Sequence, residues 1–145
     1  PPMSTVGGGR MASGGPNEVW SYGETLYEMC RKYMFLRERL RPYITGLMQD
    51  AHEKGTPVIR PMFYDFPEDK NCWTLDGQYM FGGSLLVAPV MEPGSARRPS
   101  ICAGTWYNAW TGEAVEGGRT VEADAPLTVI PVYTRDAGLL GVFKG

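Results

Sequence analysis

Histidine is almost absent from this chain of 145 residues, and its scarcity excludes several kinds of active site. The only histidine is His52, which lies beside Glu53 and Lys54 in a polar stretch. A histidine metal cluster or a Ser-His-Asp triad would need this one residue, and the G-x-S-x-G sequence of many serine hydrolases is also missing. We therefore expect a solvated His52, no metal site, no cofactor and no serine nucleophile.

Paired cysteines and long apolar runs are missing as well. Cys30, Cys72 and Cys102 are odd in number and form no C-x-x-C pair, which predicts reduced thiols that mainly pack in the interior. This usage of cysteine favours an intracellular, cytoplasmic location. No run of about eighteen apolar residues occurs, so the sequence predicts no membrane-spanning segment.

Charge of one sign is not in excess. The formal net charge is −2, and the arginines of residues 24–53 are interleaved with acidic residues, which is typical of a solvated helix face. Nucleic-acid binding needs clustered basic charge without compensation, so no nucleic-acid partner is expected. The apolar content of 43% is compatible with a packed core.

Residues 1–17 contain two glycine runs and three prolines but hardly any apolar periodicity. We predict that this segment is a disordered or cloning-derived leader. The glycines do not indicate a phosphate-binding loop, because no strand precedes them and no G-K-[ST] sequence follows.

Residues 24–53 have the three-or-four spacing of apolar side chains that is typical of an amphipathic helix. Pro42 lacks a backbone donor, which predicts a kink or a restart and two shorter helices. Ser21 and Glu24 have the spacing of a capping box, and Gly55 can adopt the left-handed cap at the other end. The apolar positions are Leu26, Met29, Cys30, Tyr33, Leu36, Leu40, Ile44, Leu47 and Ala51.

Residues 58–145 favour strands instead, because short runs of branched and aromatic residues alternate with glycine and proline turns. Many short strands at close spacing are typical of an antiparallel sandwich. The fold class predicted is therefore α+β, a long kinked helix followed by an antiparallel β-sandwich. The predicted strands are residues 58–66, 78–81, 84–90, 99–103, 105–109, 113–115, 119–122, 127–131 and 138–143.

Asp65, Glu68 and Asp69 form the only dense acidic group outside the predicted helix. Paired carboxylates are the usual apparatus of glycoside hydrolysis. Acids in a turn, however, more often cap backbone amides and stay solvated, so we predict a structural role for these three.

Four aromatic residues in the predicted strand region are able to stack on sugar rings. Such residues more often fill a sandwich core or cover its edge, because burying one aromatic side chain stabilises the fold by about 1.5 to 3 kcal/mol. The four are Trp73, Trp106, Tyr107 and Trp110.

Six short sequence motifs, taken together, resemble the C-terminal part of the α-glycosidases of glycoside hydrolase family 31, which includes α-glucosidases and α-xylosidases. In that family a (β/α)₈ barrel is followed by a proximal β-sandwich. The resemblance therefore implies that residues 18–57 are the helical end of a barrel and residues 58–145 the sandwich. The motifs are LRERLRPY (36–43), GTPVIRPM (55–62), DFPED (65–69), QYMFG (78–82), LLVAPV (85–90) and WYNAWTG (106–112).

The resemblance also implies what this sequence lacks. The two catalytic aspartates of the family lie upstream in the barrel, one of them in a W-x-D-M-N-E type of sequence that does not occur here. A substrate-contacting histidine of an R-x-H-G type is expected just before Glu18, but residues 10–13 read RMAS. We therefore assign no catalytic, cofactor-binding or metal-binding residue.

Two functions of different class follow. The first is a C-terminal fragment of a retaining α-glucosidase or α-xylosidase of carbohydrate metabolism, with an α-linked oligosaccharide or glycoside as its partner and no activity by itself. The second is a non-catalytic accessory or sugar-binding sandwich. In either case an apolar helix face without the barrel is expected to favour self-association.

Overall fold

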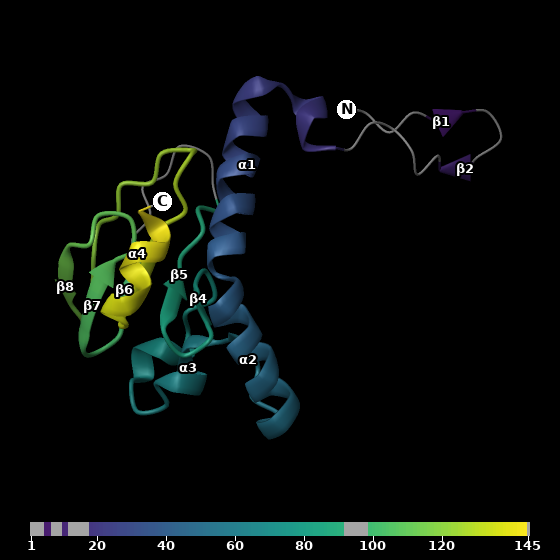
Figure 1. Ribbon diagram of the computed structural model, residues 1–145. Helices are drawn as coiled ribbons and strands as arrows, with labels where there is room; N and C mark the ends of the chain where they lie inside the picture. The colour runs from purple at the N-terminus through teal and green to yellow at the C-terminus, as the bar shows by residue number, and fades with distance from the viewer. Residues whose placement is uncertain (1–4, 7–9, 12–17, 92–98, 145) are drawn as a thin grey trace. The chain divides into compact units, whose positions relative to one another are not determined.

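The computed structural model describes residues 5–6, 10–11, 18–91 and 99–144 (Figure 1). It contains two compact units, Pro1–Arg39 and Leu40–Gly145. Most of the predicted leader lies outside the described residues. Its described part is a short antiparallel pair, β1 (Thr5–Val6) and β2 (Arg10–Met11).

The first unit also contains the 3₁₀ helix η1 (Val19–Tyr22) and the helix α1 (Glu24–Arg39). The predicted cap at Ser21 is wrong. Ser21 lies inside η1, where its amide donates to the carbonyl of Glu18 at 2.9 Å, and Gly23 with φ 94° separates η1 from α1. The local 3₁₀ turn occupies the segment that the capping box would need, and a glycine can adopt this φ at little cost.

The predicted apolar stripe is unevenly buried along α1. Leu36 is only 6% exposed, whereas Leu26 is 39% exposed. Met34 and Phe35, which broaden the stripe, are each 54% exposed. Leu36 is therefore the buried apolar position of α1, and exposed apolar side chains precede it in the sequence.

The second unit begins with α2 (Arg41–Lys54), which confirms the predicted restart at the proline. Pro42 lies in the first turn, where a missing backbone donor costs nothing. The predicted C-terminal cap is also confirmed, because Gly55 has φ 67° and its amide donates to the carbonyl of Ala51 at 3.0 Å.

Helix α2 is attached to the turn between two strands. The hydroxyl of Tyr43 donates to the carbonyl of Phe81 at 2.6 Å and accepts from the amide of Ser84 at 3.2 Å. Gly82, with φ 62°, lies directly under the helix, and a Cβ there would collide with Tyr43 Oη and the Leu47 side chain. The glycine thus allows both a tight turn and a close approach of helix and sheet.

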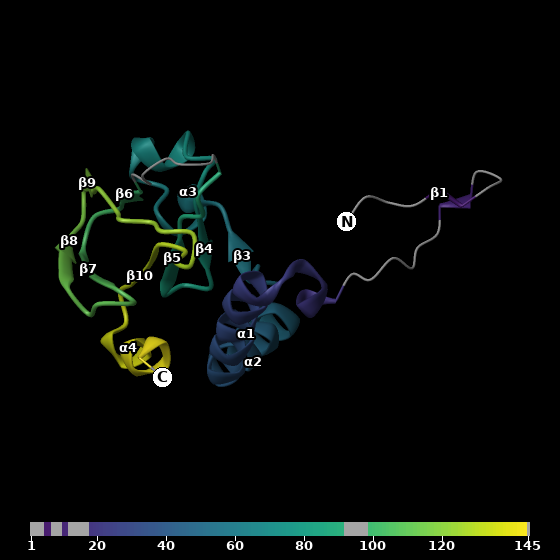
Figure 2. The same ribbon diagram turned by 90° about the horizontal axis from the view of Figure 1, so that it is seen from above.

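A six-stranded antiparallel sheet forms the centre of this unit, and Figure 2 shows its strands from above. Its order is β3-β4-β5-β10-β7-β8, and β6 pairs separately with β9. The β4–β5 hairpin confirms the prediction for residues 78–90, with Tyr79 opposite Val87 and Phe81 opposite Leu85. The strands are β3 (Ile59–Arg60), β4 (Tyr79–Phe81), β5 (Leu85–Val87), β6 (Ser100–Ile101), β7 (Thr105–Asn108), β8 (Ala114–Glu116), β9 (Arg119–Thr120) and β10 (Val132–Thr134).

Residues 58–66 are not one strand. They form β3 and then a single helical turn, α3 (Met62–Asp65), followed by the 3₁₀ helix η2 (Lys70–Trp73). Pro61 has φ −62° and ψ 153°, the extended geometry of a residue that precedes a helix, and it offers no donor to a neighbouring strand. Branched and aromatic composition alone therefore gave the wrong prediction after Pro61.

Two other predicted strands are also wrong. Residues 127–131 lie outside the strands, and β10 begins directly after them. Residues 138–143 fall in η3 (Ala137–Leu139) and α4 (Leu140–Phe143). The side chain of Asp136 accepts a hydrogen bond from the amide of Gly138 at 2.8 Å, so this capping residue starts a helical turn where the apolar composition suggested a strand.

The core of the second unit joins the large sheet to the segments beside it. Trp106 and Tyr133 of the large sheet belong to the same buried cluster as Met62 of α3 and Ile101 of β6. The observed fold is thus a mixture of helices with antiparallel sheet. No helix within the described part of the chain has the length and apolar character needed to span a membrane.

Buried phenols and thiols make this unit sensitive to alkali. Burial raises the pKa of Tyr43, Tyr133, Cys72 and Cys102 above their ordinary values. A group whose pKa is higher in the folded state contributes stability that is fully present below the unfolded pKa and is lost as the pH rises through the folded pKa. We therefore expect the urea midpoint to fall when the pH rises from about 8 to about 10.5.

The variant Tyr133→Phe tests this expectation, since it keeps the buried ring and removes one titrating proton. Its midpoint is expected to fall less steeply with pH than that of the unaltered chain. Parallel pH profiles for the two proteins would contradict the assignment of Tyr133 as one of the responsible groups.

Candidate functional site

The predicted acidic turn follows α3, and its first carboxylate is not solvated. Asp65 Oδ1 accepts from Arg60 Nη1 at 2.9 Å, and these side chains are only 12% and 10% exposed. Arg60 Nε also donates to the carbonyl of Pro57 at 2.7 Å. Asp65 Oδ2 is buried and has no hydrogen-bond partner among the residues that the structure describes. The prediction that Asp65 stays solvated is therefore wrong, because β3 and α3 bring a buried guanidinium to it.

The other two acids of the turn occupy different environments. Glu68 is exposed, as predicted. Asp69 caps η2, since its side chain accepts from the amide of Asn71 at 3.0 Å. The structural role predicted for Asp69 is thus confirmed, and the three carboxylates do not form one acidic centre.

A cavity of about 350 Å³ lies between η2 and the β6–β9 pair. Among the described residues of its wall, Asp69 is the one carboxylate and Arg119 the one cation. Asp65 and Glu68 are not among the lining residues. On the η2 side, the residues that line the cavity include Asp69, Asn71 and Cys72. On the side of the β6–β9 pair, they include Ser100, Cys102 and Arg119.

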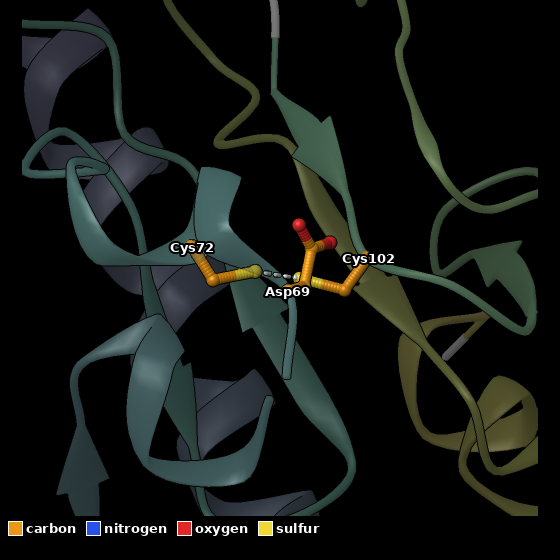
Figure 3. A group of neighbouring side chains, drawn as sticks. All are labelled: Asp69, Cys72 and Cys102. Atoms are coloured by element: carbon orange, nitrogen blue, oxygen red, sulfur yellow. Dashed lines mark hydrogen bonds between the residues drawn. The ribbon is translucent and has the colours of Figure 1, made fainter. Parts of the chain in front are cut away.

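Cys72 and Cys102 point toward each other with Asp69 beside them (Figure 3), and all three residues line the cavity. One carboxylate oxygen and the two sulfur atoms all lie within 4.8 Å of one another. Both cysteines are free thiols, and burial raises the pKa of each. Sequence reasoning missed this group because 30 positions separate the cysteines and only the sheet topology brings them together.

The predicted aromatic residues divide into buried and exposed members. Trp106 is 1% exposed and donates from Nε1 to the carbonyl of Cys102, and Tyr107 and Trp110 are half-buried. Trp73 is 59% exposed and stacks on Phe63, with ring centroids 5.2 Å apart and planes 17° apart. The core role is confirmed for Trp106, whereas Trp73 does not fill the core.

His52 is exposed near the end of α2, as predicted. The cavity at η2 has one carboxylate in its wall, whereas retaining glycoside hydrolysis needs two carboxyl groups about 5 to 5.5 Å apart across the sugar. Within the described residues, this cavity therefore does not hold the acid and nucleophile of such a reaction.

Comparison with protein families gives a match over much of the second unit. The model of the glycosyl hydrolase family 31 C-terminal domain matches residues 55–140. Alpha-glucosidase 2 of Bacillus thermoamyloliquefaciens is 34% identical over 126 residues, which are 86% of this chain and 16% of that enzyme. The alpha-xylosidase of Saccharolobus solfataricus is 35% identical over 127 residues, which are 86% of this chain and 17% of that enzyme.

Solved structures give the same result. An alpha-xylosidase of this family from a soil metagenome, complexed with xylose, superposes with a TM-score of 0.84 at 43% identity and covers 91% of this chain and 20% of that one. A dextranase from Flavobacterium johnsoniae, complexed with glucose, gives a TM-score of 0.79 at 33% identity over 83% of this chain and 15% of that one.

The helix, the antiparallel sheet and the matched motifs are those of an α-glycosidase C-terminal domain. The chain belongs to glycoside hydrolase family 31. It spans about one sixth of the length of the curated relatives that it matches first.

Proposed function

We propose that this chain is the C-terminal part of a retaining α-glucosidase or α-xylosidase whose catalytic aspartates lie outside these 145 residues. The family match over residues 55–140 is the observation that carries the proposal. The η2 cavity supports it, because Asp69 is the one carboxylate among the described residues of its wall.

The proposed division of the chain follows the family architecture. Residues 18–57 are the helical end of a (β/α)₈ barrel, and residues 58–145 are a proximal β-sandwich in which the β6–β9 pair covers part of the large sheet. The shared buried cluster of Ile101 and Trp106 supports this second layer. Exposed apolar residues such as Phe35 and Met48, at 54% and 58%, favour self-association of the isolated chain.

The proposed substrate of the complete enzyme is an α-linked oligosaccharide or glycoside. Relatives named as alpha-glucosidases and alpha-xylosidases, and structures that hold xylose or glucose, support this class. The role proposed for the present residues is to complete and stabilise the enzyme rather than to perform the chemistry.

An activity assay tests the proposal directly. The purified 145-residue chain is expected to give no turnover of chromogenic α-glucosides or α-xylosides, whereas the product of a longer reading frame that includes the barrel is expected to hydrolyse at least one of them. The matched control is the variant Asp65→Asn/Glu68→Gln, with circular dichroism to check that it remains folded, because Asp65 pairs with the buried Arg60. Turnover by the short chain that disappears in this variant would overturn the proposal, as would an inactive complete product.

A second candidate function is sugar binding without catalysis. It is favoured by the exposed, stacked pair of Phe63 and Trp73, with Tyr64 beside it at 47% exposure. Titration with isomaltose and with xylose, followed by tryptophan fluorescence, tests this function. A saturable change that is absent in Trp73→Ala and retained in Trp110→Ala would support it, and no change in the unaltered chain would contradict it.

A further inference from the structure

Two buried cysteines from distant parts of the second unit meet at one point. Cys72 lies in η2 and Cys102 directly follows β6, and Figure 3 shows their sulfur atoms facing each other. The Sγ atoms are 2.7 Å apart, and the two residues are 1% and 2% exposed. The proposed glycosidase function does not use either thiol.

The backbone on both sides of this contact is fixed by hydrogen bonds. In η2 the amide of Cys72 donates to the carbonyl of Asp69 at 2.9 Å. The carbonyl of Cys102 accepts from Trp106 Nε1 at 2.9 Å, and the preceding carbonyl, of Ile101, accepts from the amide of Gly118 at 2.7 Å. The fold therefore holds the two thiols together with little freedom left to lose on cross-linking.

The sulfur–sulfur distance distinguishes between a metal ion and a disulfide. Two thiolates on a tetrahedral Zn²⁺, each about 2.3 Å from the metal, lie about 3.7 Å apart. The sulfur atoms of a disulfide are about 2.05 Å apart. The observed contact of 2.7 Å is closer than two thiolates on one Zn²⁺ would lie, and the Asp69 carboxylate is already engaged with the amide of Asn71.

We propose that Cys72 and Cys102 form a reversible disulfide that ties η2 to the β6–β9 pair when the chain meets an oxidised low-molecular-weight disulfide such as oxidised glutathione. One protein thiolate attacks a sulfur of the reagent, which breaks the reagent's S–S bond and releases one small thiol. The second protein thiolate then attacks the mixed disulfide, forms the Cys72–Cys102 bond and releases the second small thiol. The two protons of the cysteines end on the two small thiols.

Access and ionisation set the rate of this exchange. The cavity of about 350 Å³ has both cysteines in its wall, so a small reagent approaches them from that side. Burial raises the pKa of both thiols, which makes the attacking thiolate scarce at neutral pH. The exchange is therefore expected to be slow near neutrality and faster at about pH 8.5.

The cross-link is expected to be favoured by the fold and to stabilise it in return. Because 30 positions separate the cysteines, closing the loop removes considerable freedom from the unfolded chain. The equilibrium constant for forming the cross-link with glutathione is expected to be on the order of 100-fold higher in the folded chain than in the chain unfolded by urea. By the same linkage, the thermal midpoint is expected to rise by roughly 10 °C on oxidation.

The experiment uses the complete 145-residue chain in glutathione redox buffers at about pH 8.5, followed by acid quenching, thiol counting and non-reducing peptide mapping. The expected result is one remaining free thiol, Cys30, and a Cys72–Cys102 peptide that has lost two hydrogen atoms. The thermal midpoint of the oxidised chain is measured before and after reduction.

Three variants are oxidised in parallel with the unaltered chain. Cys30→Ser is expected to oxidise normally, whereas Cys72→Ala and Cys102→Ala are expected to form no internal cross-link. Three free thiols at equilibrium, stable glutathione adducts on Cys72 or Cys102, or a cross-link no more favoured in the folded chain than in urea would overturn the proposal. Protection of both thiols by added Zn²⁺, reversed by a chelator and without loss of hydrogen, would identify a metal site instead.

Discussion

Leu47→Asp is expected to destabilise the second unit by about 3 to 5 kcal/mol. Leu47 is 8% exposed and packs over Gly82, where no Cβ intervenes between α2 and the β4–β5 turn. An aspartate in this position would place an unpaired carboxylate against the close contact between helix and sheet. Urea denaturation followed by circular dichroism measures the loss as a lower midpoint.

The neighbouring residue provides the control. Met48 is 58% exposed, so Met48→Asp changes the charge of the same helix without burying it and is expected to shift the stability by less than about 0.5 kcal/mol. Equal midpoints for Leu47→Asp and the unaltered chain would show that α2 does not pack on this turn.

Arg60→Met is expected to cost about 3 to 5 kcal/mol, because it leaves the buried carboxylate of Asp65 without its cation. The pair is 2.9 Å apart and nearly enclosed, and the second oxygen of Asp65 accepts no hydrogen bond from the described part of the chain. The double variant Arg60→Met/Asp65→Leu removes both charges and is expected to recover most of the lost stability. A double-mutant cycle in urea measures this recovery as a coupling energy.

An exposed ion pair gives the comparison for this cycle. Lys54 Nζ lies 2.6 Å from Asp50 Oδ1, but these side chains are 65% and 44% exposed. Lys54→Met is therefore expected to change the stability by at most about 1 kcal/mol. Similar losses for Lys54→Met and Arg60→Met would mean that burial does not control the strength of the Arg60–Asp65 pair.

The family motifs and the local backbone signals were readable from the sequence. Pro42 and Gly55 bound α2 because a proline without a donor and a glycine with positive φ act within a few residues of chain. The β4–β5 hairpin followed for the same reason from two apolar runs around a glycine turn. Short-range steric and hydrogen-bonding preferences thus determined these elements before any tertiary contact was known.

Tertiary structure alone decided the environments of the polar side chains. Asp65 is held by Arg60, the thiols of Cys72 and Cys102 meet across 30 positions, and Trp73 is exposed. Residue type predicted solvated acids and packing thiols, and it did not distinguish aromatic residues that fill the core from those that lie at the surface. Burial and pairing depend on which segments the sheet order β3-β4-β5-β10-β7-β8 and the β6–β9 pair bring together, and a linear pattern of residue types does not contain that order.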